Sequence, residues 1–261
     1  MLAPSECWQA HLVRRRYFTD TVINHFKSPK ALLKHIGLTL GVCLKLRKHS
    51  LILGLHSLQG EGVLVGRLGL VCGTSTCHML LADSPKLTPG VWGPFYSALY
   101  PGLWLMEGGQ SSSGSLLEHV IHSHPAWQEL EAKAKEQSTS PHNVLASLLE
   151  SMSKEAGEES VCSLSKSVHV WPDFHGNRSP LADPTMTGSV VGLTLATDLP
   201  SLATQYLATV QALCYGTKHI LDQLSSHGHP ASSVAVCGGL AKSPLFLQTQ
   251  ADVLGKQVIK K

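Results

Sequence analysis

The sequence predicts an α/β domain in which a mixed sheet is flanked by helices, and three observations support this prediction. First, "GVLVGRLGLVCGTSTCHMLLAD" has the pattern of two apolar strands joined by a turn of small residues at Gly73. Second, Leu199 to Gly228 has the apolar spacing of one long amphipathic helix. Third, "SSVAVCGG" is a β-branched strand that runs into Gly238-Gly239 and precedes a further helical pattern. Strands and helices therefore share the chain from about residue 56 onward.

Four more helices are indicated by local signals. One is expected to begin within "SSSGSLLEHVIHSH", where a serine suits the N-cap position. Two more are expected over residues 126–136 and 141–156, and Pro141 suits the first turn of the second of these. The last would be capped by Ser243, carry Pro244 in its first turn and stop at Gly255.

Short strands are predicted between these helices. Leu103–Glu107 would follow an aromatic, proline-rich loop and would break at Gly108-Gly109-Gln110. Val168–Trp171 would lead into a loop rich in Gly, Pro, Asn and Asp, and "KQVIKK" begins one more strand. In contrast, residues 1–55 keep neither helical spacing nor alternation, so we expect a poorly specified N-terminal segment followed by a domain over residues 56–261.

Composition excludes several classes of protein. Of 261 residues, 43% are hydrophobic and 15% charged, which favours a packed core over disorder. The net charge of +3 is small, and the basic clusters lack interleaved aromatic residues, so we expect no nucleic-acid partner. The apolar run Ile36–Leu44 is too short to span a bilayer, and residues 1–20 lack the order of a signal peptide. We therefore expect a cytoplasmic protein without membrane contact.

The seven cysteines are odd in number, scattered, and without a C-x-x-C pair, which favours a reducing compartment and no disulfide framework. The histidine pairs His122/His124 and His227/His229 lie in polar stretches without a cysteine or carboxylate at ligand spacing. We expect these histidines to be exposed, and we assign no residue to a metal site.

The glycine turns are the candidate binding features. A phosphate needs converging backbone N–H groups, and glycine lets it approach them. Gly73, Thr74 and Ser75 form one such turn, and Gly238-Gly239 precedes a helix whose N-terminal end favours anions. Each turn alone is more typical of ordinary chain reversal than of a binding site. Together with Gly108 and Gly109 between them, they indicate an RNase-H-like (actin-like ATPase) fold that holds one nucleotide.

Several collinear stretches carry a resemblance to a known family. They are "RLGLVCGTSTCHM", "PGVWGPF", "PGLWLMEGGQSSSG", "VWPDFHGNRSPLADP", "GLTLATDLPSLATQYLATVQALCYGT" and "CGGLAKSPLFLQTQADVLG". From about His56 the chain resembles the C-terminal domain of the FGGY carbohydrate kinases, in particular the ribulokinase-like branch. The resemblance implies ATP and Mg²⁺ as cofactors and a small-molecule sugar, such as the pentulose ribulose, as the partner whose hydroxyl is phosphorylated. The oligomeric state is left open.

The resemblance also assigns roles to individual residues. Gly73 and Thr74, with Ser75 beside them, match a phosphate-contacting turn of the family, and Gly108 and Gly109 match a middle nucleotide contact. Gly238, Gly239 and Ser243 match its adenosine motif, in which many relatives have asparagine in place of this serine.

The departures from the family pattern limit what is expected of this chain. The resembling region begins after the family's catalytic aspartate, so no catalytic residue is assigned, and it stops before a glycine-alanine-rich helix. We therefore expect a domain incomplete at both ends, as in a truncated isoform, and a chain that is inactive alone. The alternative is a non-catalytic nucleotide-binding or interaction module.

Overall fold

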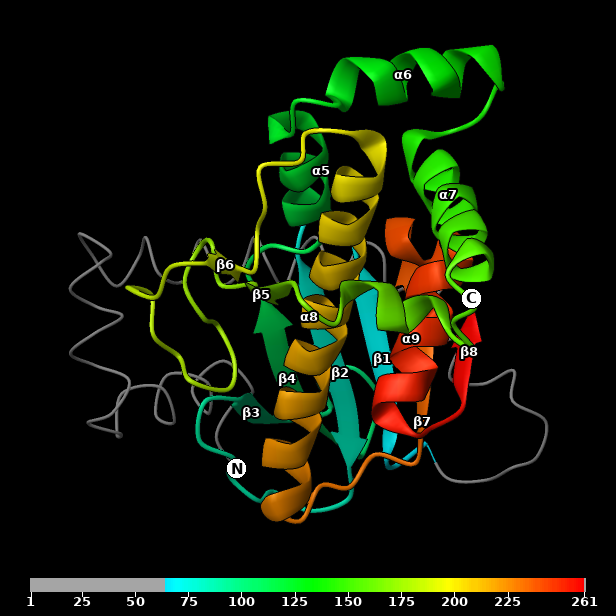
Figure 1. The fold of residues 1–261 in the computed structure, drawn as a ribbon. Coiled ribbons are helices and arrows are strands. Elements are labelled where there is room, and N and C mark those ends of the chain that lie inside the picture. Colours follow the sequence, from blue (N-terminus) through cyan, green and yellow to red (C-terminus); the bar gives the residue numbers. More distant parts are fainter. Residues whose placement is uncertain (1–63, 261) are drawn as a thin grey trace. The chain divides into compact units, whose positions relative to one another are not determined.

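A computed structural model of the chain describes residues 64–260 (Figure 1), and the prediction for residues 1–55 lies outside this range. The strands and helices follow one another as β1 (Arg67–Cys72), β2 (Thr76–Ala82), β3 (Trp92–Tyr96), β4 (Trp104–Gln110), α5 (Gly114–Ser123), α6 (Trp127–Glu136), α7 (Pro141–Glu155), the 3₁₀ helix η2 (Val161–Ser165), β5 (His169–Trp171), β6 (Ser189–Val191), α8 (Leu199–Ser226), β7 (Ser233–Gly238), the 3₁₀ helix η3 (Gly239–Lys242), α9 (Pro244–Leu254) and β8 (Val258–Lys260).

Six strands form a mixed sheet in the order β3-β4-β2-β1-β7-β8. The pairs β3–β4, β4–β2 and β2–β1 are antiparallel, whereas β1–β7 and β7–β8 are parallel. The predicted mixed sheet is thereby confirmed. Because β1 and β7 run in the same direction, with Cys72 opposite Gly238, the segments that follow these two strands leave the sheet at the same edge.

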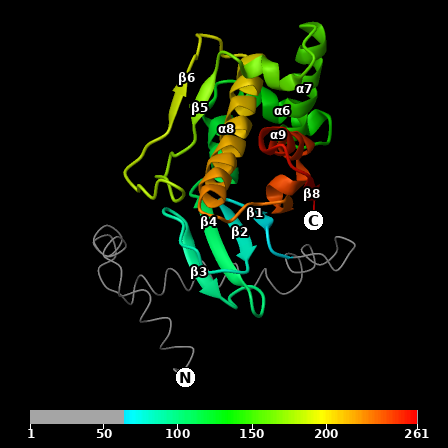
Figure 2. The same cartoon turned by 90° about the horizontal axis from the view of Figure 1, so that it is seen from below.

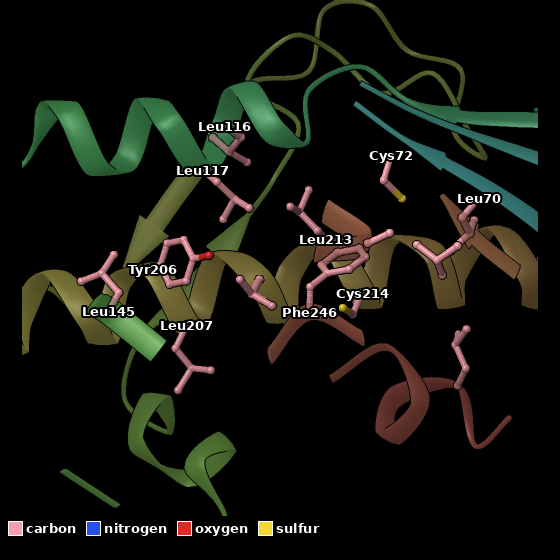
Figure 3. Close-up of a cluster of buried hydrophobic side chains, with 14 of the residues drawn as sticks. Leu70, Cys72, Leu116, Leu117, Leu145, Tyr206, Leu207, Leu213, Cys214 and Phe246 are labelled. Atoms are coloured by element: carbon pink, nitrogen blue, oxygen red, sulfur yellow. The ribbon is translucent and has the colours of Figure 1, made fainter. Parts of the chain in front are cut away.

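Helix α8 is 28 residues long, and α5, α7 and α9 pack against it. Figure 2 shows α7, α8 and α9 on the same side of the sheet. The core between these layers contains Leu70 of β1, Val236 of β7 and Tyr206 of α8, each at most 2% exposed. Figure 3 shows Phe246 of α9 in this cluster with Leu213 of α8. Burial of apolar surface here fixes the position of α8 and α9 over the sheet.

Local signals set the helix boundaries much as predicted. The side chain of Asp198 accepts a hydrogen bond from the Ser201 N–H at the start of α8, and Ser140 does the same for Asn143 in α7. Gly255 ends α9 in the left-handed conformation (φ 59°). Such N-caps each stabilise a helix by about 1 kcal/mol.

Strand β4 is longer than predicted, because it continues through Gly108 and Gly109 to Gln110. The strand continues because of a tertiary contact with α8. A Cβ atom on Gly108 would lie 2.9 Å from Cγ2 of Ile220, so the missing side chain lets α8 pack closely on the strand. Gln110 then fixes the helix by donating from Nε2 to the Leu213 carbonyl oxygen (2.8 Å).

Other expectations about loops and surface need correction. Trp92–Tyr96, predicted as a loop, is the edge strand β3, where an irregular register accommodates Pro94. His124 is buried rather than exposed, and its Nδ1 accepts a hydrogen bond from the Ala126 N–H (3.1 Å). His229 is also buried, and its Nε2 lies 2.7 Å from the Lys86 carbonyl oxygen. Both rings satisfy backbone groups that have little access to water.

Within residues 64–260, no helix has both the length and the apolar character needed to cross a membrane.

Candidate functional site

The two predicted glycine turns meet at one edge of the sheet. Gly73 follows β1 and Gly239 follows β7, and these strands are parallel neighbours. Gly73, Thr74, Gly238 and Gly239 are all exposed, whereas the strand residues before them are largely buried. The structure therefore brings Gly73 and Thr74 close to Gly238 and Gly239, as one ligand spanning both turns would require.

The first turn is held in place from behind by α5. The Gly73 N–H donates to the Ser75 carbonyl oxygen (2.9 Å), which closes the turn. The carbonyl oxygens of Gly73 and Thr74 accept from the Gly114 and Ser113 N–H groups (3.0 and 2.9 Å). These two amides stand at the N-terminus of α5, where Ser113 is the N-cap residue. They therefore donate to the Gly73 turn and are not available to a ligand.

Serine and threonine hydroxyls strengthen the same attachment. Ser115 Oγ donates to the Thr74 carbonyl oxygen (2.9 Å) and lies 2.7 Å from Ser112 Oγ. Thr76 Oγ1 donates to Ser113 Oγ (2.8 Å), so the predicted capping serine bonds to a neighbouring strand instead of capping the helix. Sequence reasoning missed this support, although the run of three serines was its visible signal.

The second turn requires a glycine at one position only. Gly238 has φ 97°, and a Cβ atom there would clash with the Cys72 carbonyl oxygen. At Gly239 the same atom would be 3.9 Å from that oxygen, an ordinary contact. As predicted, α9 begins after Ser243, and the 3₁₀ helix η3 lies between Gly238 and this cap. Ser243 caps α9, accepting from the Phe246 N–H (3.2 Å).

Gly108 and Gly109 are not at the exposed edge. Both are buried in β4, where Gly108 faces α8 and Gly109 pairs with Cys77 of β2. A Cβ atom on Gly109 would lie 3.3 Å from Cζ of Arg178, whose guanidinium stacks on the Trp92 ring at 5.0 Å. These glycines make room for α8 and for an arginine. Their contact with a nucleotide stays a prediction.

Two buried titratable groups near the turns are held neutral. Burial, together with the charge of Arg178, lowers the pKa of His78 to about 3. Burial raises the pKa of the Cys72 thiol to about 12, although its hydrogen bond to Thr76 acts in the opposite direction. The thiol at the end of β1 is therefore protonated at neutral pH and is a poor nucleophile.

Tyr206 belongs to a network that sequence reasoning missed. Its hydroxyl lies 3.2 Å from His142 Nδ1, and His142 Nε2 lies 2.9 Å from Glu118 Oε1. The three residues lie on α8, α7 and α5. Because they are far apart in sequence, no local spacing connects them. Within residues 64–260, no three His, Cys, Asp or Glu side chains gather closely enough to hold a metal ion.

Comparison with known proteins gives a consistent result. Residues 68–260 match the family of sequences described as the FGGY family of carbohydrate kinases, C-terminal domain. The chain is 51% identical over 205 residues to the FGGY carbohydrate kinase domain-containing protein of Xenopus laevis. The matched region covers 78% of this chain and 37% of that protein. It is 37% identical over 195 residues to a D-ribulokinase of Saccharomyces cerevisiae. This matched region covers 75% of this chain and 27% of the relative.

Solved structures show the same fold. The xylulose kinase from Rhodospirillum rubrum superimposes with a TM-score of 0.59 at 21% identity, over 80% of this chain and 37% of that one. A xylulose kinase from Bifidobacterium adolescentis gives a TM-score of 0.56 at 22% identity, over 80% of this chain and 35% of that one. The predicted actin-like fold and the predicted resemblance to ribulokinases are confirmed. The chain spans 37% of the length of the animal relative that it matches.

Proposed function

The chain belongs to the FGGY family of carbohydrate kinases, and from this premise we propose that residues 64–260 hold the nucleotide of an ATP-dependent sugar kinase. One observation carries the proposal. The parallel pair β1–β7 places the exposed backbone of Gly73-Thr74 and of Gly238-Gly239 side by side. Exposed turns at the carboxyl ends of adjacent parallel strands form a common ligand position in α/β proteins.

The residues at this edge fit a triphosphate. The N–H of Gly73 is used inside its own turn, so phosphate oxygens would be held by the amides and hydroxyls of Thr74 and Ser75. Gly238 and Gly239 leave a bare backbone opposite, and Ser243 would meet the nucleoside. Bound Mg²⁺ neutralises phosphate charge during transfer. The described residues gather no cluster of His, Cys, Asp or Glu side chains that could hold the ion, so the phosphates and water would supply its ligands.

The proposed acceptor is the hydroxyl of a pentulose such as ribulose, because curated relatives include ribulokinases at 33–34% identity. Transfer also needs a base at that hydroxyl, which contributes about 10²–10⁴-fold. It needs an aligned acceptor as well, and alignment is worth about 7–11 kcal/mol. No residue among 64–260 is assigned to either task. We therefore propose that this part of the chain binds ATP without transferring phosphate, and that it works in the cytoplasm.

The substitutions Gly73→Ala and Gly239→Ala test the nucleotide site. Their new methyl groups would lie 3.8 and 3.9 Å from the nearest atoms, so the fold should tolerate both. They would stand between the backbone and the phosphates, and the Kd for Mg-ATP measured by calorimetry should rise about tenfold or more. Gly157→Ala is the control variant, because Gly157 follows helix α7 instead of β1 or β7 and has a φ of 65°. It should lower the melting temperature and leave the Kd unchanged.

An unchanged Kd in both turn variants would contradict the site. A second assay separates the kinase from the alternative, a non-catalytic nucleotide-binding or interaction module. The full chain is incubated with ATP, Mg²⁺ and a panel of ketopentoses, and ADP release is followed. The proposal expects ATP binding without sugar-dependent ADP release from this chain. Sugar-dependent release would assign acceptor-side chemistry to the chain itself.

A further inference from the structure

Arg178 is held in a fixed position by the loop between β5 and β6. Asn177, the residue before it, donates from Nδ2 to Asp173 Oδ2 within the same loop (3.0 Å). Ser179, the residue after it, is 3% exposed and packs against β4, where a Cβ atom on Gly108 would lie 3.7 Å from the serine Cβ. The backbone on both sides of Arg178 is therefore anchored.

The Arg178 side chain lies over a part of β4 that β3 does not cover. The last pair between these strands is Trp92 with Glu107, so the end of β4 beyond Glu107 has no partner in β3. Here Cζ of Arg178 lies 3.3 Å from the position of a Cβ atom on Gly109, and it stands 5.0 Å from the centre of the Trp92 ring. Stacking on an aromatic face stabilises a guanidinium in one place. An arginine that is already ordered loses less entropy when it binds a ligand.

The positive charge of Arg178 has no carboxylate partner among residues 64–260, because the ion pairs there join other side chains. In its own loop, Asp173 is bonded to Asn177. The other carboxylate of the loop, Asp183, accepts from the Thr185 hydroxyl (2.7 Å). A guanidinium carries five N–H donors in a planar fork that matches the oxygens of a carboxylate or phosphate. Half-buried and without a paired anion, Arg178 is available to an anionic ligand.

The guanidinium lies at the same edge of the sheet as the Gly73 turn. Gly109 pairs with Cys77, the second residue of β2, and β2 begins directly after Gly73–Ser75. A Cβ atom on Gly109 would lie 3.4 Å from the Thr76 carbonyl oxygen and 3.3 Å from Arg178 Cζ, so these two groups flank one point. Neighbouring strands are about 4.8 Å apart, which places β4 about 10 Å from β1. Since neither glycine turn contains a cation, Arg178 can balance phosphate charge that the turns leave unbalanced.

We propose that Arg178 binds a phosphate group of the nucleotide held at the glycine turns. Two N–H groups of its fork would donate to two oxygens of one phosphate, which fixes the orientation of that group and balances its charge. Gly109 supports this contact, because a side chain there would press on the guanidinium. The inference rests on the proposed function, since it requires that the nucleotide lies at the turns.

The test measures the Kd of Mg-ATP for the full chain by calorimetry. Arg178→Gln removes the charge, and its Kd should rise about tenfold to a hundredfold, as expected when a hydrogen bond to a charged group is lost. Arg178→Lys keeps the charge without the planar fork and should lose less affinity. Lys218→Gln is the matched control. It removes the same charge, but Lys218 is already paired with Asp222 (2.6 Å), so its Kd should equal that of the wild type.

A second measurement separates the charge of Arg178 from its packing. Wild-type binding of Mg-ATP should weaken as sodium chloride rises from about 0.05 M to about 0.5 M, because salt screens the attraction between charges. Binding by Arg178→Gln should weaken less over this range. Melting temperatures of the ligand-free proteins show whether each variant is folded. If Arg178→Gln is not folded, Gly109→Ala replaces it, because its methyl group would displace the guanidinium and should also raise the Kd.

The outcomes distinguish the inference from the function on which it rests. If the wild-type chain does not bind Mg-ATP, the proposed function fails and the inference fails with it. If it binds Mg-ATP and Arg178→Gln has the same Kd, only the inference is overturned. A higher Kd in Arg178→Gln with the salt response of the wild type would also overturn the inference, because the arginine would then act through packing alone.

Discussion

Replacing His78 with glutamine should remove much of the sensitivity of this domain to mild acid. His78 lies on β2, is completely buried, and places Nε2 3.0 Å from Thr217 Oγ1. Thr217 gives its only proton to the Leu213 carbonyl oxygen (3.3 Å), so Nε2 must carry the hydrogen and donate. Among the described residues, Nδ1 has no hydrogen-bond partner, and a second proton there would be a buried charge near Arg178.

The size of the effect follows from the pKa values of His78 in the unfolded and folded chain. This pKa falls from its ordinary value of 6.5 to about 3 in the folded domain, because burial and then Arg178 disfavour the charged ring. The unfolded chain therefore binds more protons, and stability rises with pH. The contribution of His78 is complete above about pH 6.5 and is lost as the pH falls toward about 3. At about pH 4.5, about 2.7 kcal/mol of stability should be lost, at 1.36 kcal/mol per pH unit.

The measurement is thermal unfolding by circular dichroism at about pH 7.5 and about pH 4.5. For a domain of this size, 1 kcal/mol shifts the melting temperature by about 2–4 °C, so His78 should account for about 5–11 °C of the acid-induced decrease. In His78→Gln the amide nitrogen can still donate to Thr217, and this part of the decrease should disappear. The comparison uses the difference between the two pH values, so any cost of the substitution at neutral pH cancels.

His122→Gln is the reference for replacing a histidine at the surface, where the ring is half exposed. It should lose as much stability on acidification as the wild type. Equal acid-induced decreases in the wild type and in His78→Gln would refute the reasoning, because His78 would then accept its proton in the folded domain without cost.

Three further substitutions test the packing around the candidate site. Gly108→Ala places a methyl group 2.9 Å from α8 and should cost about 1–3 kcal/mol in urea unfolding; weaker nucleotide binding at unchanged stability would contradict its packing role. Gly238→Ala combines a positive φ with a clash against the Cys72 carbonyl oxygen, and should lower stability in the same assay by on the order of 3 kcal/mol. Phe246→Ala should cost about 3–5 kcal/mol in thermal unfolding, since this ring is 3% exposed; a loss below about 1 kcal/mol would mean that α9 does not depend on it.

Helix positions could be predicted from the sequence because their signals are local. Helix α9 contains eleven residues and begins at Pro244, directly after its cap Ser243, and Gly255 follows its last residue. These are the positions that the local signals predicted. The strand–turn–strand unit around Gly73 was also predictable, because two apolar runs separated by small residues have few other arrangements. The mixed sheet and flanking helices followed from such units.

The remaining features depend on contacts between distant segments. Glycine pairs usually interrupt strands, so ending β4 before Gly108 was the reasonable local inference, and only the approach of α8 explains why the strand continues. The meeting of the two glycine turns was inferred only from their combination, because it depends on the parallel pairing of strands separated by more than 150 residues. The hydrogen-bond partners of His142 come from two other helices, so nothing in its neighbourhood in the sequence indicates them.

Gly114 has a consequence for anyone who redesigns this chain. A side chain there would approach the Gly73 carbonyl oxygen to within 2.6 Å, so every substitution at position 114 would push the neighbouring turn out of place. In a saturation screen, this position should therefore give the same phenotype as the turn, although it lies 41 residues downstream in the first turn of α5. Libraries that aim to alter the ligand preference should leave it unchanged and vary only the hydroxyl residues of the turn itself.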